Sequence, residues 1–317
     1  MMQETGSGKY EQLLERCRGL EPIPAAVAWP CDESSLAGAI DAGRDGLIVP
    51  ILVGAAAKIS EVARAKGIAL RETEVVDAPT SRAAAAKAVE LVRMGRAELL
   101  LKGSLHSDEI LGAVVARETG LRTGRRLSHV FLMDVPTYHK VLVVTDGAIN
   151  IAPTLEDKVD ICQNAIDLAR AFGIERPKLA ILAAVETVNS KMPATLDAAA
   201  LCKMAERGQI RGGLLDGPLA FDNAISREAA KIKGITSEVA GDPDILLAPD
   251  LEAGNMVAKQ LSFLARADSA GLVLGARVPV ILTSRADSVR SRIASCAVAM
   301  LAAHARRKSA SLAGQGA

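Results

Sequence analysis

Short aliphatic segments alternate with helix-like stretches along most of the chain. The aliphatic segments are AAVAW, LIVPILVG, ELLLKG, HVFLMDVP and KVLVVTDG (25–29, 47–54, 98–103, 129–136 and 140–147). The stretches between the first of them have helical periodicity, and each ends on a glycine: 35–46, 55–67 and 81–95. Apolar runs separated by glycine-terminated helices are typical of parallel strands joined by crossover helices. The pattern therefore predicts an α/β protein with buried strands.

One connection breaks this alternation. Only Thr137, Tyr138 and His139 separate the runs at 129–136 and 140–147, too few residues for a crossover helix, so we expect an antiparallel hairpin. A second series of strands opens with KLAILAA at 178–184. Further strands are predicted at GGLLDGP, DILLAP and VPVILT (212–218, 244–249 and 278–283), and a last helix at about 285–306. We place the change of domain near 146–155.

Composition narrows the class of protein. A chain of 317 residues is long enough for two domains at about 150 residues each. Half of the residues are apolar, but the chain has only one Trp, two Tyr and four Phe, so the core is predicted to be aliphatic. A formal charge of +1 gives no global field that would recruit nucleic acid or an anionic membrane. We therefore expect a small-molecule partner, with no nucleic acid and no membrane.

The cysteines and the termini indicate a cytoplasmic protein. The five cysteines are far apart, form no C-x-x-C pair and lie in aliphatic surroundings, so reduced, buried thiols and no metal site are expected. The N-terminal segment is polar, and no stretch approaches the ~20 apolar residues of a membrane helix.

Polar residues gather where predicted strands end. Ligands of open α/β sheets bind at these ends, because loops and helix N-termini converge there. The residues that we expect to bind substrate are Lys102, Asn150, Asp216, Gly217, Asn255 and Lys259. Most of them also have a structural interpretation: Asp216-Gly217-Pro218 is a good turn, Asn255 a helix cap, and the two lysines ordinary solvated side chains.

The junction at Ser284-Arg285 carries the strongest signal. A hydroxyl and a guanidinium sit where a strand turns into a helix and free backbone N–H groups form an anion site. An arginine in a first helical turn opposes the helix dipole unless an anion lies beside it. The alternative is a capping box, in which Ser284 and Asp287 only start an apolar helix.

Several blocks along the chain together resemble the phosphate acetyl/butyryltransferase family. They occur in family order over roughly residues 80–305: LLLKGSLHSDEIL, TDGAINIAPTLEDKVDICQNA, GGLLDGPLAFDNAIS, DILLAPDLEAGNMVAKQL and AGLVLGARVPVILTSRADS (99–111, 145–165, 212–226, 244–261 and 270–288). The resemblance implies a two-domain, three-layer α/β/α fold similar to the isocitrate/isopropylmalate dehydrogenases, with the active-site cleft between domains. It also implies a C-terminal helix that returns to the first domain, giving domains 1–148 plus 290–317 and 149–289, and a homodimer.

The same resemblance implies reversible transfer of an acyl group between coenzyme A and inorganic phosphate. Phosphate would attack the acyl-CoA directly in a ternary complex, without metal or cofactor. Arg285 would hold phosphate with its two-pronged guanidinium, and Ser284 would donate to the developing oxyanion. A carboxylate would manage the proton of the thiolate leaving group, and we assign Asp287 to that task.

The chain departs from the family pattern at two positions. Acetyl-specific members carry an aspartate seven positions after the matched serine, where this chain has Ser291, so Asp287 either substitutes for it or only caps the helix. Phe263 stands where many acetyl enzymes place an arginine, which leans towards the butyryl branch. Acetyl transfer is our first hypothesis. Butyryl transfer and a non-catalytic protein that binds CoA or acyl phosphate are the alternatives.

Other enzyme classes fit less well. A β-decarboxylating dehydrogenase would need an aspartate cluster for a divalent metal, and no such spacing occurs. A P-loop fails because Gly6-Ser7-Gly8-Lys9 lacks the upstream glycine, and Tyr10 replaces the magnesium-binding Ser or Thr.

Overall fold

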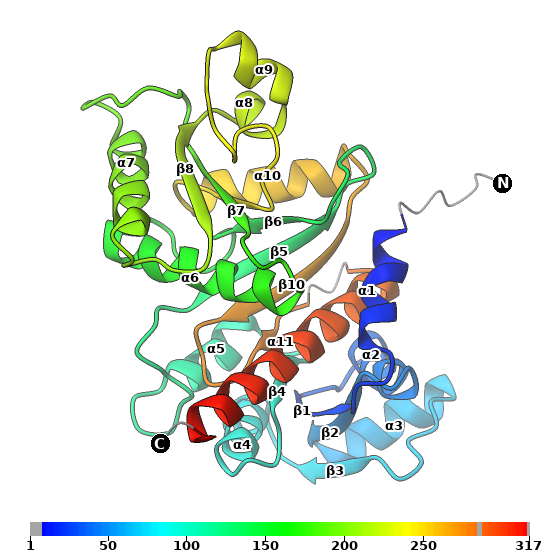
Figure 1. Ribbon diagram of the computed structural model, residues 1–317. Coiled ribbons are helices and arrows are strands. Elements are labelled where there is room, and N and C mark those ends of the chain that lie inside the picture. Colours follow the sequence, from blue (N-terminus) through cyan, green and yellow to red (C-terminus); the bar gives the residue numbers. More distant parts are fainter. Residues whose placement is uncertain (1–7, 284–286, 316–317) are drawn as a thin grey trace, which may run out of the picture. The chain divides into compact units, whose positions relative to one another are not determined.

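The computed structural model describes residues 8–283 and 287–315, and the chain divides into two compact units (Figure 1). We name them by their place in the sequence. The terminal unit comprises Tyr10–Arg125 and Ala270–Ala317, and the central unit comprises Arg126–Ser269 together with Lys9 near the N-terminus. Lys9 belongs with the central unit because its ammonium donates to Asp134 Oδ1 at 2.9 Å and to the carbonyl oxygen of Val135 at 2.7 Å.

The terminal unit contains a mostly parallel sheet in the order β3-β2-β1-β4-β11-β10. Its strands are β1 (Ile23–Ala28), β2 (Ile48–Gly54), β3 (Glu74–Asp77), β4 (Leu99–Lys102), β10 (Asp268–Leu274) and β11 (Val280–Ile281). The register pairs Ala26 with both Ile51 and Leu100, and only β10 runs antiparallel to its neighbour β11. The strand order reverses at β1, so loops that follow β1 and β4 diverge at a topological switch point.

Helices cover both faces of this sheet. They are α2 (Glu33–Arg44), α3 (Ala56–Lys66), α4 (Ser81–Arg93), α5 (Ser107–Val115) and α11 (Val289–Gln315). Helix α1 (Lys9–Cys17) contacts α11, where Cys17 Sγ donates to the carbonyl oxygen of Ala297. Right-handed crossovers place α2 and α3 on one face and α4 on the other. Because α11 packs on α2, and α5 packs on α4, each joins one of these two layers.

The central unit repeats this architecture with the strand order β5-β6-β9-β7-β8. The strands are β5 (Ser128–Asp134), β6 (Leu142–Thr145), β7 (Lys178–Leu182), β8 (Leu214–Leu219) and β9 (Ile245–Leu247). The predicted hairpin is confirmed, since β5 and β6 pair antiparallel with Phe131 opposite Val144. The helices are α6 (Leu155–Ala171), α7 (Pro193–Glu206), α8 (Phe221–Ile225), α9 (Arg227–Ile232) and α10 (Leu251–Phe263). The predicted two-domain α/β class is thereby confirmed.

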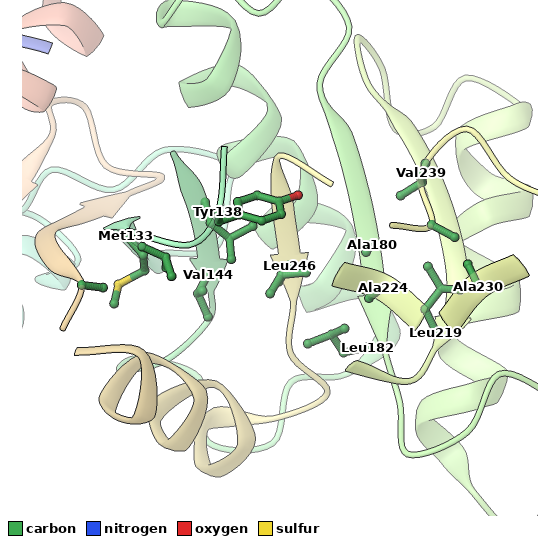
Figure 2. Close-up of a cluster of buried hydrophobic side chains, with 14 residues drawn as sticks. Met133, Tyr138, Val144, Ala180, Leu182, Leu219, Ala224, Ala230, Val239 and Leu246 are labelled. Carbon is green, nitrogen blue, oxygen red and sulfur yellow. The ribbon is translucent and has the colours of Figure 1, made fainter. Parts of the chain in front are cut away.

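An aliphatic core crosses the sheet of the central unit beneath α8, α9 and α10. Figure 2 shows Val144, Leu246, Ala180 and Leu219 in succession across the strands, and all four are at most 2% exposed. Its aromatic member, Tyr138, is tied by a hydrogen bond of 2.7 Å from its hydroxyl to the carbonyl oxygen of Pro243. Burial of such side chains contributes about 25 cal/mol per Å² of apolar surface.

The compact units change over at residues 125–126 and 269–270, whereas the sequence places these changes at 148–149 and 289–290. The hairpin accounts for the first difference, because β6 pairs with β9, where Val144 lies opposite Leu246. A hairpin pattern shows that two strands pair with each other. The sequence of the hairpin does not indicate which of the two sheets its strands β5 and β6 join.

A group of paired charges closes the amino-terminal edge of the central sheet. Asp242 accepts hydrogen bonds from the ammonium of Lys178 at 2.7 Å and forms ion pairs with Lys140 and Arg227. Burial alone would raise the pKa of Asp242, but the hydrogen bonds from Lys178 and Lys140 outweigh it and hold that pKa well below its usual range. We interpret this cluster as structural, because each of its cations is paired with a carboxylate.

No helix in the described part of the chain is long and apolar enough to cross a membrane.

Candidate functional site

The loop after β6 is built around one buried carboxylate. Asp146, 2% exposed, accepts hydrogen bonds from the backbone N–H groups of Ala148, Ile149 and Asn150 at 2.9, 3.1 and 3.1 Å. Its Oδ2 also accepts from Asn150 Nδ2 at 2.6 Å. The loop 146–150 is therefore held in a fixed shape at the carboxyl end of the strand.

Asn150 is predicted to bind substrate, but its side-chain amide is fully engaged in hydrogen bonds within and beside this loop. Its Nδ2 donates to the carbonyl oxygen of Leu127 as well as to Asp146, and its Oδ1 accepts from Arg126 Nε at 2.8 Å. The Arg126 N–H in turn donates to Asp160 on α6. The side chain joins the loop to the start of β5, so we infer that Asn150 shapes the site.

The first turns of α10 pack directly on the same loop. Asp250 caps the helix by accepting from the Ala253 N–H at 2.8 Å. A Cβ built on Gly254 would overlap the carbonyl oxygen of Asp146, so only glycine allows this approach. Asn255 Nδ2 donates to the carbonyl oxygen of Gly147 at 3.0 Å.

Asn255 is therefore not the helix cap that one sequence interpretation allowed. The helix begins at Leu251, and Asn255 lies in its second turn with its amide on the neighbouring loop. The structure thus brings Asn150 and Asn255 together, through Asp146 and Gly147. Lys259 follows one turn later on α10, exposed, with its ammonium 5.9 Å from the centroid of the Phe263 ring.

His129 also lies at this site, although its sequence context indicates only a structural or surface residue. It is 3% exposed, lies edge-on to Phe131 with 4.2 Å between ring centroids, and its Nδ1 has no hydrogen-bond partner within the described residues. Burial lowers its pKa to about 4; the charge of Lys259 adds to this, and Asp146 opposes it. At neutral pH the imidazole is therefore uncharged. A lone histidine before an apolar strand carries no sequence signal for this arrangement.

Asp216 and Gly217 occupy a different position from the one predicted. The segment Asp216-Gly217-Pro218 is not a turn at a strand end; it lies inside β8, the edge strand, where proline is tolerated. A Cβ on Gly217 would stand 2.7 Å from the carbonyl oxygen of Ile181, so the glycine lets β8 approach β7 closely. Strands β9 and β7 separate these residues from the loop after β6.

A second buried amide lies beyond β8. Asn223, fully buried at the start of α8, has no hydrogen-bond partner for Oδ1 in the part of the chain that the structure describes. Its Nδ2 donates weakly to Glu186 at 3.4 Å, and Lys233 pairs with Glu186 at 3.0 Å. The side-chain atoms of His129 and Asn223 that lack partners thus both lie near the carboxyl edge of the central sheet, where ligands of such sheets bind.

At the carboxyl ends of β1 and β4 in the terminal unit, the neighbouring residues pack around Trp29, which directly follows β1. Trp29 has a φ of 57°, rare for a non-glycine residue, and its carbonyl oxygen accepts from the Ser104 N–H and hydroxyl, both at 2.9 Å. Lys102 ends β4 and is 8% exposed. A Cβ on Gly103 would stand 2.5 Å from the carbonyl oxygens of Ala28 and Trp29, so this edge is tightly packed.

Ser284 and Arg285, our principal catalytic candidates, lie outside the described residues. On one side of them, Thr283 follows β11 and its Oγ1 accepts from Arg292 Nη1 at 3.2 Å. On the other side, Ser288 caps α11, since its Oγ accepts from the Ser291 N–H at 3.1 Å. The helix begins at Val289, so Asp287 precedes it and is not at the third helical position that the sequence predicts.

Comparison with known proteins identifies the family. The sequence model of a family described as phosphate acetyl/butaryl transferase matches residues 78–300. The chain belongs to this family. A phosphate acetyltransferase of Rhizobium meliloti is 63% identical over 305 residues, which cover 96% of both chains. A phosphate butyryltransferase of Clostridium acetobutylicum is 42% identical over 93% of this chain and 98% of its own length.

Among solved structures, a branched-chain phosphotransacylase from Enterococcus faecalis has a TM-score of 0.76 at 30% identity, over 89% of this chain and 99% of its own. The predicted family and the predicted two-domain α/β fold are thus confirmed. The family match includes the loop after β6, the start of α10 and residues 283–292. Trp29 precedes the matched region.

Proposed function

We propose that the protein is a phosphate acetyltransferase that interconverts acetyl-CoA plus phosphate with acetyl phosphate plus CoA. The observation that carries this proposal is the 63% identity, over 96% of both chains, to a protein of that name. Lys102, the loop after β6 and the first turns of α10 all fall within the family match.

In the proposed reaction an oxygen of inorganic phosphate attacks the thioester carbonyl carbon within a ternary complex. A C–O bond forms, the C–S bond breaks, and the electron pair leaves on the coenzyme A sulfur, which takes up a proton. We assign Arg285 to phosphate, because a guanidinium offers two parallel donors to its oxygens. Ser284 donates to the carbonyl oxygen as its negative charge develops.

Asp287 is the carboxylate that we assign to proton transfer at the thiolate. Ser291 occupies the position of the expected carboxylate, but its N–H donates to Ser288 Oγ and its hydroxyl accepts from the Ser288 hydroxyl at 3.2 Å. Ser291 is thereby engaged in the helix start. Asp287 lies outside the helix and half-buried, two residues after Arg285 in the chain.

Lys259 and Lys102 are proposed to meet the anionic groups of the substrates. Lys259 is an exposed cation one helical turn from Asn255, which suits a phosphate group of coenzyme A. Asn150 and Asn255 support the site through the side-chain hydrogen bonds described above, and Gly217 stays a prediction from the sequence. Asp216 stays a prediction from the sequence.

Butyryl transfer is the second candidate, favoured by Phe263. This residue is 75% exposed on α10, at a position where many acetyl-specific enzymes have an arginine. A phosphate butyryltransferase is also among the relatives, at 42% identity. A non-catalytic protein that binds CoA or acyl phosphate is the third candidate, favoured by the missing carboxylate at Ser291.

Family membership also suggests where the protein is located, its oligomeric state and its cofactor requirement. We propose a cytoplasmic homodimer that needs neither metal nor cofactor. Light scattering of the purified chain tests the dimer, and a result of one chain per particle would reject it. Assays with added Mg²⁺ and with a chelator test the metal requirement.

The decisive experiment measures phosphate-dependent cleavage of acetyl-CoA and butyryl-CoA side by side. Arg285→Ala is the matched control, expected to fold normally and to lose most turnover. Faster turnover of acetyl-CoA supports the first proposal, and faster turnover of butyryl-CoA supports the second. Binding of CoA without phosphate-dependent turnover of either thioester would favour the non-catalytic homologue.

A further inference from the structure

A groove runs between α4 and α5 within the terminal unit. Its volume is about 780 Å³, which falls inside the range of about 300–1,000 Å³ that is usual for small-molecule sites. The two helices contact each other, and at their amino-terminal ends Ser81 Oγ donates to Glu109 Oε1 at 2.6 Å. The groove therefore lies between two elements that are held together at one end.

Small side chains leave this space open. Ala83 and Ala86 line the groove from α4, and Ala113 lines it from α5. Residues three apart share one face of a helix, so the two alanines of α4 form a continuous apolar strip. A neighbouring face of the same helix carries the buried Ala84 and Ala88. The groove thus has an apolar wall on each side.

Two guanidinium groups add an uncompensated positive charge. Arg93 and Arg277 both line the groove and are exposed, and in the described part of the chain neither side chain makes a hydrogen bond or an ion pair. The third cation of the lining, Lys87, is paired with Glu90 at 2.9 Å. A single anionic group from outside the chain would therefore complement two unpaired cations.

The two arginines come from neighbouring positions in the sheet. Arg93 is the last residue of α4, which leads to the amino end of β4, and Arg277 precedes the amino end of β11. Strands β4 and β11 pair in parallel, with Leu100 opposite Val280. The Arg277 N–H donates to the carbonyl oxygen of Leu121 at 2.9 Å, which fixes the backbone of its loop.

The groove is distinct from the polar groups at the carboxyl ends of the same sheet. Lys102 ends β4, whereas Arg93 lies on the segment that enters β4. The ligands of open α/β sheets are expected at the carboxyl ends, where Lys102 and Trp29 lie. Arg93 and Arg277 are therefore left without a task in the proposed acyl transfer.

We propose that the groove between α4 and α5 binds a small organic anion with an apolar body, either a carboxylate or a phosphate ester. Its head group contacts Arg93 and Arg277, because a guanidinium offers two parallel donors to the oxygens of either group. Its apolar body lies along the alanines, where it loses contact with water. The inference does not depend on the proposed function.

Calorimetric titration of the full-length chain with octanoate and with octyl phosphate tests the proposal and distinguishes the two head groups. At least one of the two should bind. Octanol lacks the charge and inorganic phosphate lacks the apolar body, so each should bind to the groove at least about tenfold more weakly, the loss expected for one charge-assisted hydrogen bond or about two buried methylene groups. Failure of both amphipathic anions to bind would overturn the proposal.

Substitutions in the groove separate this site from any other that takes the same anions. Arg277→Gln and Arg93→Gln should each raise Kd at least about tenfold. Ala86→Phe fills the groove from an exposed position and should abolish binding there, and Ala113→Leu does so from the facing helix if the first variant does not fold. Binding that persists unchanged in the filled and the arginine variants belongs elsewhere and would refute the proposal.

Arg96→Gln is the matched control. Arg96 lies just after α4, pairs with Glu74 at 2.7 Å and does not line the groove, so its loss should leave Kd unchanged. An equal rise of Kd in Arg96→Gln and Arg277→Gln would show a general effect of surface charge and would contradict a specific site.

Light scattering of Ala86→Phe tests the competing occupant, a second copy of the chain. An unchanged particle mass together with lost anion binding supports the small-molecule site. A lower particle mass than that of the wild type would show that the groove is a contact between subunits, and the inference would be wrong.

Discussion

The backbone of Asp146 touches the backbone of Gly254, so the loop after β6 and the first turns of α10 meet with no side chain between them. This contact brings the amide of Asn255 to the carbonyl oxygen of Gly147. It also explains why glycine occurs in a helix at a cost of about 1 kcal/mol relative to alanine.

Gly254→Ala should therefore destabilise the protein, contrary to the usual effect of alanine in a helix. The new methyl group would push α10 away from the loop, and we expect a loss of at least about 2 kcal/mol, as for an overpacked core. Gly112 in α5 is the control, because a Cβ there meets nothing within 4 Å. Gly112→Ala should stabilise by up to about 1 kcal/mol in urea unfolding; equal effects of the two changes would contradict the close approach.

Ser284→Ala tests the oxyanion assignment. Removal of one donor to a developing oxyanion lowers kcat by about 10²–10³-fold, so a loss of that size is expected with the melting temperature unchanged. Steady-state rates over a range of acetyl-CoA concentrations provide the measurement. A lower melting temperature with unchanged kcat would show instead that Ser284 serves only the local fold.

Asp287→Asn should lower kcat by about 10²-fold or more if Asp287 handles the proton of the thiolate. The change removes the charge and keeps the shape. Ser291→Asp, which restores the carboxylate of acetyl-specific relatives, should recover part of the rate when combined with Asp287→Asn. Full activity of the single Asp287→Asn variant would remove this residue from the mechanism.

His129 gives folding a specific dependence on pH. Its pKa is about 4 in the folded chain against an ordinary 6.5, so between these values only the unfolded chain binds the proton. Stability contributed by neutral His129 is complete above pH 6.5 and is lost as the pH falls towards 4, by about 3 kcal/mol in all.

We expect His129→Phe to remove this part of the pH dependence, while the charged groups that face the site, Asp146 and Lys259, stay in place. Urea unfolding at several pH values between 4 and 7 measures the difference between the two proteins, and His129→Leu serves if the larger ring does not fit. Parallel curves for variant and wild type would show that the imidazole is not held neutral.

The element pattern, the hairpin and the family could all be predicted from the sequence, because each depends on local periodicity or on ordered blocks of residues. The sequence left the start of α10 undecided between Asp250 and Asn255, five positions apart, because both are good capping residues. Likewise, Ser284 and Ser288 both qualify as caps, and the structure selects Ser288. Local sequence cannot distinguish two possible capping residues when tertiary packing determines where the helix begins.

Asp216 and His129 show a different limit. Asp216-Gly217-Pro218 has turn chemistry, but the close approach of β8 to β7 at Gly217 is a tertiary requirement that overrides it. His129 acquires its properties from α10, more than a hundred residues later in the chain, through burial and the charge of Lys259. In both cases the contacting residues are distant in the sequence, so the sequence around Asp216 or His129 does not contain them.

Trp29 provides a fluorescent probe that reports on the terminal unit alone. It is the single tryptophan of the chain, half-buried after β1 with the ammonium of Lys58 5.4 Å from its ring centroid. Tryptophan fluorescence therefore reports on the surroundings of β1, whereas circular dichroism averages over the helices of both units. If the unfolding transitions followed by fluorescence and by circular dichroism coincide, the two units unfold cooperatively. If the transitions are separated, their order shows which unit unfolds first.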